Sequence, residues 1–242
     1  SATAIYGSRG ANGVILITTK RGKQGKTTVT YDGYVGFQHV AKKLDMMNAT
    51  EWAEMVNEGA ETDGRPIYYS NTSSDPLYPA MSQLGEGTDW QDQIFRTAPI
   101  HSHNVSVNGG SENTKFAVVA SYFGQEGVVK NQDFNRVSLR NNIDTKISKV
   151  VDLSTSLTIS RVFANTGREN GDGGGNTSII NASLVMPPTV PIYDPTTGEY
   201  VRLNYLPGSS TVPNPVPYVK HLQDKGTIDR ILASADLTFH II

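Results

Sequence analysis

Polar and apolar residues alternate along several stretches of the chain. In residues 136–147 (RVSLRNNIDTKI) the even positions are polar, whereas Val, Leu and Ile dominate the odd positions. Residues 151–160 (VDLSTSLTIS) and 231–241 repeat this pattern. Because successive side chains of a β-strand point to opposite faces, a period of two places polar and apolar groups on separate faces. The pattern predicts long strands, each with one wet and one apolar face.

Strand length distinguishes two kinds of β-protein. The segments 27–38, 104–109 and 116–124 bring the expected strands after Gly25 to six, although the last segment is apolar or small on both faces. A strand as long as 136–147 extends roughly 40 Å at about 3.3 Å per residue, which is enough to cross a bilayer at the usual tilt. A membrane barrel with a wet lumen fits this length. A large solvated sheet that is packed on one side is the alternative.

The connections between the expected strands differ greatly in length. Long irregular segments occupy residues 39–101 and 164–226, whereas NGGSEN and the residues around Ser148 form tight turns. The long connections fall on one side of the sheet, as in outer-membrane barrels with short periplasmic turns and long outside loops. Six strands cannot close a barrel, because an open edge in lipid leaves backbone groups unsatisfied. The expected fold is therefore all-β with minor α, as part of a larger transmembrane antiparallel barrel whose first strand rises from the periplasm.

Two segments inside the long connections are expected to be short helices. NATEWAEMVNEG has Thr50 as a possible N-cap and Gly59 near its end, and its apolar residues lie on one side. NTSIINASLVM is followed by Pro187, which stops a helix. These helices supply the minor α content.

Composition and candidate chemistry narrow the function further. The formal net charge of −2 offers no basic footprint for nucleic acid, and no stretch approaches the roughly 18 apolar residues of a membrane helix. His101 and His103 would share a strand face, but no third metal ligand lies nearby in the sequence. No catalytic constellation stands out. We therefore expect no enzyme activity, no metal and no cofactor.

The N-terminal stretch IYGSRGANGVILITT spaces three glycines, Gly7, Gly10 and Gly13, by three residues. A phosphate-binding glycine loop follows a strand and opens a helix, because helix N-terminal N–H groups hold the anion. Here the glycines precede the strand-like run from Val14 to Ile17. The order excludes a phosphate loop, and the glycines are expected to permit tight turns and close backbone approach.

Aromatic residues are frequent in the two long connections. Flat rings in loops can stack on sugars or contact another protein, and they can equally form small cores that hold the loops in place. Both roles remain open for these residues. The membrane-belt position is expected for Phe37, Tyr122 and Phe123. The aromatic residues of the long connections are Tyr68, Tyr69, Tyr78, Trp90, Tyr193, Tyr200, Tyr205 and Tyr218.

The N-terminal stretch SATAIYGSRGANGVILITTKRGK resembles the end of the plug domain in SusC/RagA-type TonB-dependent transporters. The segment TDWQDQIFRTAPIHSHNVSVNGGSENTKFAVVASYFGQEGVVKNQDFNRVSLRNNID is similar to the first barrel hairpins of that family, and MPPTVPIYDPTTGEY resembles an outer loop. The resemblance implies that residues 1–23 end an α/β plug domain and that residues 24–242 begin a barrel of about 22 strands. The residues that carry the plug signature are Tyr6, Gly7, Arg9, Gly10 and Gly13.

The family resemblance also implies a function. A receptor of this type imports large nutrients across the Gram-negative outer membrane, oligosaccharides in preference to peptides, beneath a SusD-like surface lipoprotein. The TonB–ExbB–ExbD complex then remodels the plug, through a contact segment outside these residues, and no covalent bond of the solute changes. The competing interpretation is a secreted glycan-binding β-sandwich, soluble without detergent. Candidate contacts with substrate or lipoprotein are Trp90, Tyr193, Tyr200 and Tyr205.

Overall fold

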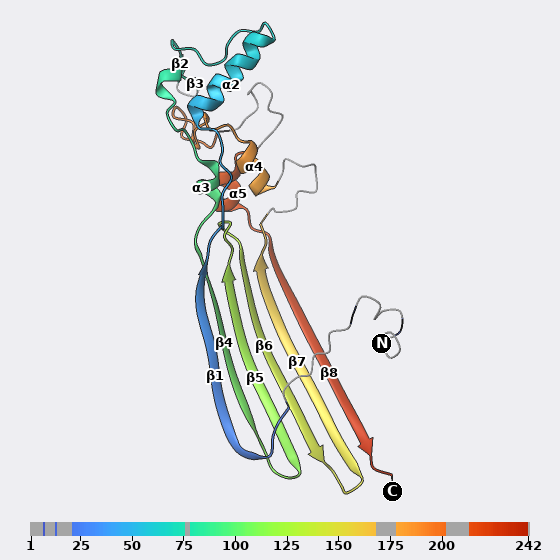
Figure 1. Cartoon of the computed structure of the whole chain (residues 1–242). Coiled ribbons are helices and arrows are strands. Elements are labelled where there is room, and N and C mark those ends of the chain that lie inside the picture. Colours follow the sequence, from blue (N-terminus) through green and yellow to red (C-terminus); the bar gives the residue numbers. More distant parts are fainter. Residues whose placement is uncertain are drawn as a thin grey trace.

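A computed structural model of the chain describes residues 7, 13, 21–75, 78–167, 178–201 and 213–241. Six long antiparallel strands form one sheet, and short helices gather beyond one of its ends (Figure 1). The strands are β1 (Gly25–Gln38), β4 (Ala98–Gly110), β5 (Thr114–Glu126), β6 (Asp133–Lys146), β7 (Val151–Asn165) and β8 (Lys225–Phe239). The helices are α2 (Ala49–Thr62), α3 (Trp90–Ile94), α4 (Ile179–Val185) and α5 (Pro215–His221), with a 3-10 turn η2 (Met81–Gln83) and a small pair β2 (Ser74–Asp75) and β3 (Tyr78–Pro79).

The order of strands in the sheet, β1-β4-β5-β6-β7-β8, follows their order in the chain. Every neighbouring pair is antiparallel, so the strands run alternately up and down. The predicted all-β antiparallel architecture with minor α is confirmed. β4 begins at Ala98, inside the segment 39–101 that was expected to be a loop, because its first residues pair with Val35–Gln38 of β1.

Cross-strand register gives the sheet two chemically distinct faces. Residues that pair across neighbouring strands point to the same face. We call the apolar face the one formed by odd-numbered residues of β1, β4, β6, β7 and β8 and by even-numbered residues of β5, and the opposite one the polar face. One central row of the apolar face consists of Tyr31, Val105, Ala120, Leu139, Ile159 and Ile231.

The phase of β5 was ambiguous in the sequence, and strand pairing settles it. Tyr122 pairs with His103 and Val137 and lies on the apolar face. Phe123 lies on the polar face, where its ring meets the edge of Phe134 and the guanidinium of Arg136. The expectation that Phe123 belongs to a membrane belt is therefore wrong, because apolar residues at adjacent positions cannot share a strand face.

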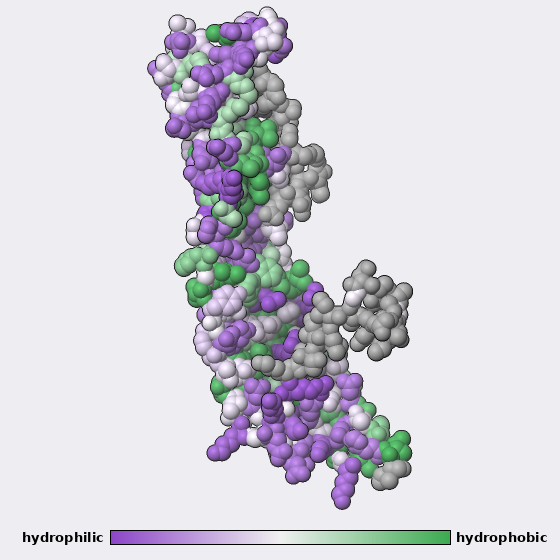
Figure 2. Space-filling model, in the orientation of Figure 1, coloured by the Kyte–Doolittle hydropathy of each residue, from purple (hydrophilic) through white to green (hydrophobic). Residues whose placement is uncertain are grey.

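The apolar face is bare among the described residues. Helices α3, α4 and α5 pack against one another beyond the end of the sheet, and no described helix or second sheet covers this face (Figure 1). Large side chains on it are consequently exposed, for example Val137 by 48% and Ile159 by 41%. In Figure 2 hydrophilic residues gather at the end of the sheet that carries the short turns. A sheet face of this kind requires an apolar environment.

An ion pair joins β7 and β8 on the apolar face. Arg161 on β7 and Asp229 on β8 are cross-strand neighbours, with Nε to Oδ1 at 2.6 Å and Nη2 to Oδ2 at 2.8 Å. This two-point geometry satisfies the carboxylate from one planar guanidinium. A charge pair matched in this way is far less costly on an apolar surface than either charge alone.

Tyr31 and His103 link β1 to β4 on the apolar face. The Tyr31 hydroxyl lies 2.7 Å from Nδ1 of His103 and over Gly33, where an added Cβ would lie 2.6 Å from the hydroxyl oxygen. The glycine therefore makes room for the tyrosine, which in turn covers exposed backbone.

Replacing Tyr31 by phenylalanine is expected to destabilise the sheet by about 1 kcal/mol, the typical net value of one hydrogen bond. Tyr34→Phe is the matched control, since Tyr34 lies on the same strand but on the polar face. Urea unfolding of the two variants in detergent micelles measures the difference. Equal unfolding midpoints for both variants would show that the bond to His103 contributes nothing.

The short turns and long connections lie at opposite ends of the sheet. Residues 111–113 and 147–150 close tight turns at one end. The other end carries the turn 127–132 and the long connections 39–97 and 166–224, which contain all the described helices (Figure 1). This arrangement places every helix on one side of the molecule.

The first helix, α2, begins with a reciprocal cap. Asn48 Oδ1 accepts from the backbone N–H of Glu51 at 2.9 Å, and Glu51 Oε2 accepts from the N–H of Asn48 at 2.9 Å. This capping box satisfies two otherwise free donors. Thr50, the expected cap, is inside the helix and donates its hydroxyl to the carbonyl of Gly85 at 3.1 Å. The N-cap prediction was therefore two residues too late.

Candidate functional site

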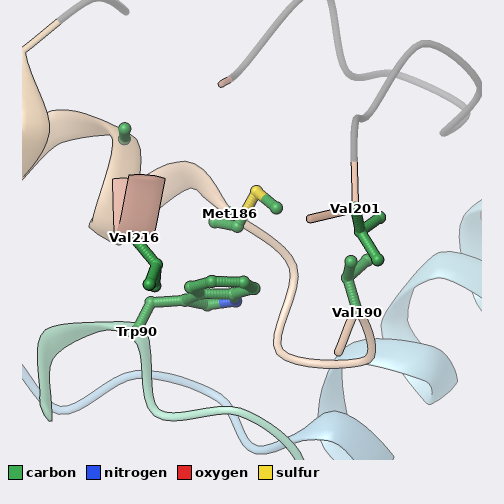
Figure 3. Close-up of a cluster of buried hydrophobic side chains, with 6 residues drawn as sticks. Trp90, Met186, Val190, Val201 and Val216 are labelled. Carbon is green, nitrogen blue, oxygen red and sulfur yellow. The ribbon is translucent and has the colours of Figure 1, made fainter. Parts of the chain in front are cut away.

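The two long connections pack together through one aromatic residue. Trp90, at the start of α3, is 3% exposed and lies among Met186, Val190 and Val216 (Figure 3). Its indole N–H donates to the carbonyl of Pro187 at 2.9 Å. Little of the Trp90 side chain is therefore open to a substrate or a partner, and the structure gives this residue a packing role. Its ring forms the core that holds α3 against α4 and α5.

Tyr69 has the same kind of role in the first long connection. It is 4% exposed, and its hydroxyl lies 2.8 Å from Oγ1 of Thr189 in the second connection. The sequence left two roles open for the aromatic residues of the long connections, ligand contact and packing within the loops. Trp90 and Tyr69 have the packing role. We call the four helices and the segments that pack with them the helical cluster.

Tyr193 and Tyr200 are less buried than Trp90, since Tyr193 is 42% exposed and Tyr200 is only partly buried against the same cluster. They flank a tight hairpin in which the N–H of Asp194 donates to the carbonyl of Glu199 at 2.8 Å. Their ring centroids are 4.8 Å apart with an interplanar angle of 29°. Lys220 of α5 donates to the Tyr193 hydroxyl at 2.8 Å, and His221 Nε2 lies 3.2 Å from the Tyr200 hydroxyl. We call these four residues the tyrosine platform.

Hydrogen bonds within the tyrosine platform shift the pKa values of three of its side chains. The bond from Lys220 lowers the pKa of Tyr193, and the same bond raises the pKa of Lys220. The contact with Tyr193 raises the pKa of Tyr200. Lys220 therefore stays protonated near neutral pH. Its ammonium lies 5.4 Å and 5.9 Å from the two ring centroids, so the platform offers flat rings, hydroxyls and one positive charge to a ligand.

A second lysine, Lys130, binds backbone carbonyls of the helical cluster. Lys130 donates to the carbonyls of Asp92 and Gln93 at 3.1 Å and 2.7 Å, near the end of α3. Burial lowers the pKa of Lys130, and the neighbouring charge of Lys220 adds to this effect. A cation at a helix C-terminus satisfies carbonyls that have no partner within the helix.

An open groove of about 650 Å³ lies between the first connection and residues 183–188. Its walls are rich in methionine, whose flexible side chain adapts to differently shaped partners. We call it the methionine groove. Sequence reasoning missed it, although the run DMMN at residues 45–48 was a visible signal. Residues that line it include Leu44, Met46, Met47, Trp52, Met55 and Met186.

Four of the predicted site residues lie outside the described part of the chain. They are Tyr6, Arg9, Gly10 and Tyr205. Gly7 and Gly13 have φ angles of +65° and +102°, which favour glycine.

His101 and His103 share a strand face, as the sequence predicts, and their rings form an aromatic group. The rings of His101 and His103 are 5.4 Å apart, and His103 bonds Tyr31. Within the part of the chain that the structure describes, no three His, Cys, Asp or Glu residues converge as metal ligands. Likewise, none of the described helices is long and apolar enough to cross a membrane.

An up-and-down sheet with one bare apolar face, one polar face and helices beyond a single end is the wall of a β-barrel. No family model matches the chain. TonB-dependent receptor P3 of Formosa agariphila is 33% identical over 80% of this chain and 18% of its own length. TonB-dependent receptor SusC of Bacteroides thetaiotaomicron is 32% identical over 99% of this chain and 24% of its own length.

Solved structures show the same fold. A structure of the RagAB peptide transporter superposes with a TM-score of 0.71 and 22% identity, over 98% of this chain and 29% of that chain. A RagAB peptide importer in the closed-closed state gives a TM-score of 0.69. The chain belongs to the SusC/RagA type of TonB-dependent receptors. It spans about a quarter or less of the length of the curated relatives it matches.

Proposed function

We propose that this chain forms the first part of the barrel wall of an outer-membrane transporter for large nutrients. The observation that carries the proposal is the sheet itself, whose apolar face is uncovered and whose opposite face is polar. Lipid on the first face and a wet lumen on the second satisfy both surfaces. The competing β-sandwich would need a second layer on the apolar face, and none is present among the described residues.

Residues 1–23 would then be the end of the plug and residues 24–242 the wall. Support comes from the segment just before β1, which attaches to the polar face. The guanidinium of Arg21 bonds Asp144, which also accepts from the Ser154 hydroxyl at 2.7 Å. A Cβ added to Gly22 would lie 2.4 Å from the backbone nitrogen of Phe116. A chain leaving a plug inside the barrel would approach the wall from this side.

The connections 39–97 and 166–224 would face the cell exterior, and the helical cluster would meet a SusD-like surface lipoprotein. The methionine groove supports this assignment, since Met46 and Met47 are about half exposed. Exposed apolar residues that rim a groove mark protein contacts. The TonB–ExbB–ExbD complex would act on a segment outside these residues.

The tyrosine platform would bind the nutrient, with oligosaccharides favoured over peptides. Sugars present flat apolar faces that stack on exposed tyrosine rings and hydroxyls that bond the ammonium and phenols. Peptides are the second candidate, because the solved structures of the same fold are of a peptide transporter.

Replacing both Tyr193 and Tyr200 by alanine in the whole receptor is expected to weaken oligosaccharide binding about tenfold, given roughly 0.5–1.5 kcal/mol per aromatic contact. An oligosaccharide array and a matched peptide array would be probed with the purified receptor. Tyr68→Ala is the control, because Tyr68 is an exposed tyrosine of the other connection. Loss of peptide binding alone would reassign the cargo, and unchanged binding to both arrays would remove the platform from the binding site.

A further inference from the structure

A polar pocket of about 470 Å³ opens at the end of the apolar face nearest the helical cluster. Three strands, β4, β5 and β6, supply its floor. Its upper wall comes from residues that precede β4 and from the turn between β5 and β6. The lining includes His101, Tyr122, Gly124 and Asn135 from the strands, with Arg96 and Gln132 above them.

Gly124 lines the pocket between two polar side chains. On the apolar face Gly124 pairs with His101 on one side and Asn135 on the other. A Cβ at this position would lie 2.6 Å from His101 Nε2 and 3.2 Å from Asn135 Oδ1. The two flanking polar side chains therefore occupy the space over the glycine.

The position of the pocket along the strands is chemically distinctive. From the middle of β4 towards the helical cluster, the apolar face changes from Val105 to His103 and then to His101. On β6 it changes over the same rows from Leu139 through Val137 to Asn135, while the outer strands of the His101 row keep apolar residues, Val35 on β1 and Phe163 on β7. In a barrel, such a change marks the level where hydrocarbon gives way to lipid headgroups. The pocket lies just beyond this change.

Two polar atoms of the pocket have no protein partner. Among the described residues, three buried side-chain N or O atoms lack a hydrogen bond, and His101 Nδ1 and Gln132 Nε2 are two of them. Both residues line this pocket. Buried polar atoms are normally hydrogen-bonded, so their concentration here indicates a site for a hydrogen-bonding ligand.

The charges around the pocket select the chemistry of that ligand. Two carboxylates, Glu126 and Asp133, line it with one guanidinium, Arg96, whose Nη1 lies 2.8 Å from Glu126. The lining thus has one more carboxylate than guanidinium, which disfavours a phosphate. The remaining groups are preorganised, since Tyr122 donates to Asn135 at 3.0 Å and Asn135 donates to Asp133 at 3.1 Å. Carboxylate and amide oxygens accept from hydroxyls, and the rings offer apolar faces.

We propose that this pocket binds the neutral sugar headgroup of a membrane glycolipid, with the lipid chains lying along the apolar face below it. The inference rests on the proposed function, because it requires that the apolar face lie in a membrane. It assigns to the outside of the wall a sugar site distinct from the tyrosine platform on the helical cluster.

The test uses the whole receptor in phosphatidylcholine nanodiscs that contain diglucosyl diacylglycerol, phosphatidylglycerol or phosphatidylethanolamine. Native mass spectrometry measures which lipid is retained. We expect the glucosyl lipid to be retained preferentially. The double variant His101→Phe/Gln132→Met should weaken its retention about tenfold, since two hydrogen bonds of ordinary strength are lost. His101 Nδ1 and Gln132 Nε2 have no protein partner, so their loss should leave folding intact.

His103→Phe is the matched control on the same strand and face. It loses a bond to Tyr31 but does not line the pocket, so stability should fall while glycolipid retention stays. Preference for either phospholipid, or full retention by the double variant, would overturn the proposal. If maltose bound as tightly as the glycolipid, the claim that the sugar is attached to a lipid would be wrong. Membrane fractionation distinguishes failure of the proposed function from failure of this inference. A receptor absent from the outer membrane would contradict the proposed function. A receptor that is in the outer membrane but shows no glycolipid preference would contradict this inference alone.

Discussion

Replacing Trp90 by alanine is expected to destabilise the helical cluster by about 3–5 kcal/mol, the usual cost of emptying a buried aromatic site. The ring is buried among residues of both long connections, and its N–H bonds Pro187. Loss of the ring should release α3 from α4 while the sheet stays paired. Hydrogen exchange of the receptor should therefore accelerate in the helices and stay slow in the strands.

Trp90→Phe is the control for this prediction. It retains most of the apolar volume and removes the bond to Pro187, so the loss should be nearer 1 kcal/mol. Slow exchange in the helices of the alanine variant would mean that the two connections hold together without this residue. Fast exchange in the strands would mean that the cluster and the sheet unfold as one unit.

Replacing Leu139 by lysine is expected to cost about 2–4 kcal/mol in a bilayer, the penalty for a charge on the lipid face near the middle of a barrel wall. Leu139 is in the central row of the apolar face. The measurement is the free energy of folding of the receptor into lipid vesicles by urea titration.

The neighbouring residue makes this experiment discriminating. Ser138 lies on the polar face, one position before Leu139, and Ser138→Lys should change the folding free energy by less than about 0.5 kcal/mol. A soluble β-sandwich that covered the apolar face would lose stability in the Leu139 variant without any lipid. Equal effects of the two lysines in vesicles would contradict a wall with lipid on one face and water on the other.

Local pattern was sufficient for the strands because period-two alternation is a property of consecutive residues. It predicted strands at 136–147 and 151–160, where β6 spans Asp133–Lys146 and β7 spans Val151–Asn165, and it separated Leu139 from Ser138. The alternation was insufficient for β5, because apolar or small residues occupy both of its faces. The pairing of Tyr122 with His103 shows which residues of β5 lie on the apolar face. The alternation also shortened β4, because Pro99 and His101 interrupt it while their backbones still pair with β1.

The cap of α2 was visible in the sequence but was placed on the wrong residue. Asn48 and Glu51 have the spacing of a capping box, and Thr50 lies between them. Two neighbouring residues, Asn48 and Thr50, can each cap a helix, so the local sequence leaves the choice between them open. In the structure Asn48 is the cap, and the Thr50 hydroxyl instead donates to the carbonyl of Gly85, which is distant in sequence.

By itself, the sequence determined the six strands, their two-faced character and the unequal connections, because each depends on neighbouring residues alone. Only the tertiary structure decided that Trp90 is buried while Tyr193 is exposed, since aromatic residues in similar loops differ only in what packs on them from elsewhere. The methionine groove and the pocket over Gly124 also required it. Both form where segments far apart in the chain meet, and no local period encodes such a meeting.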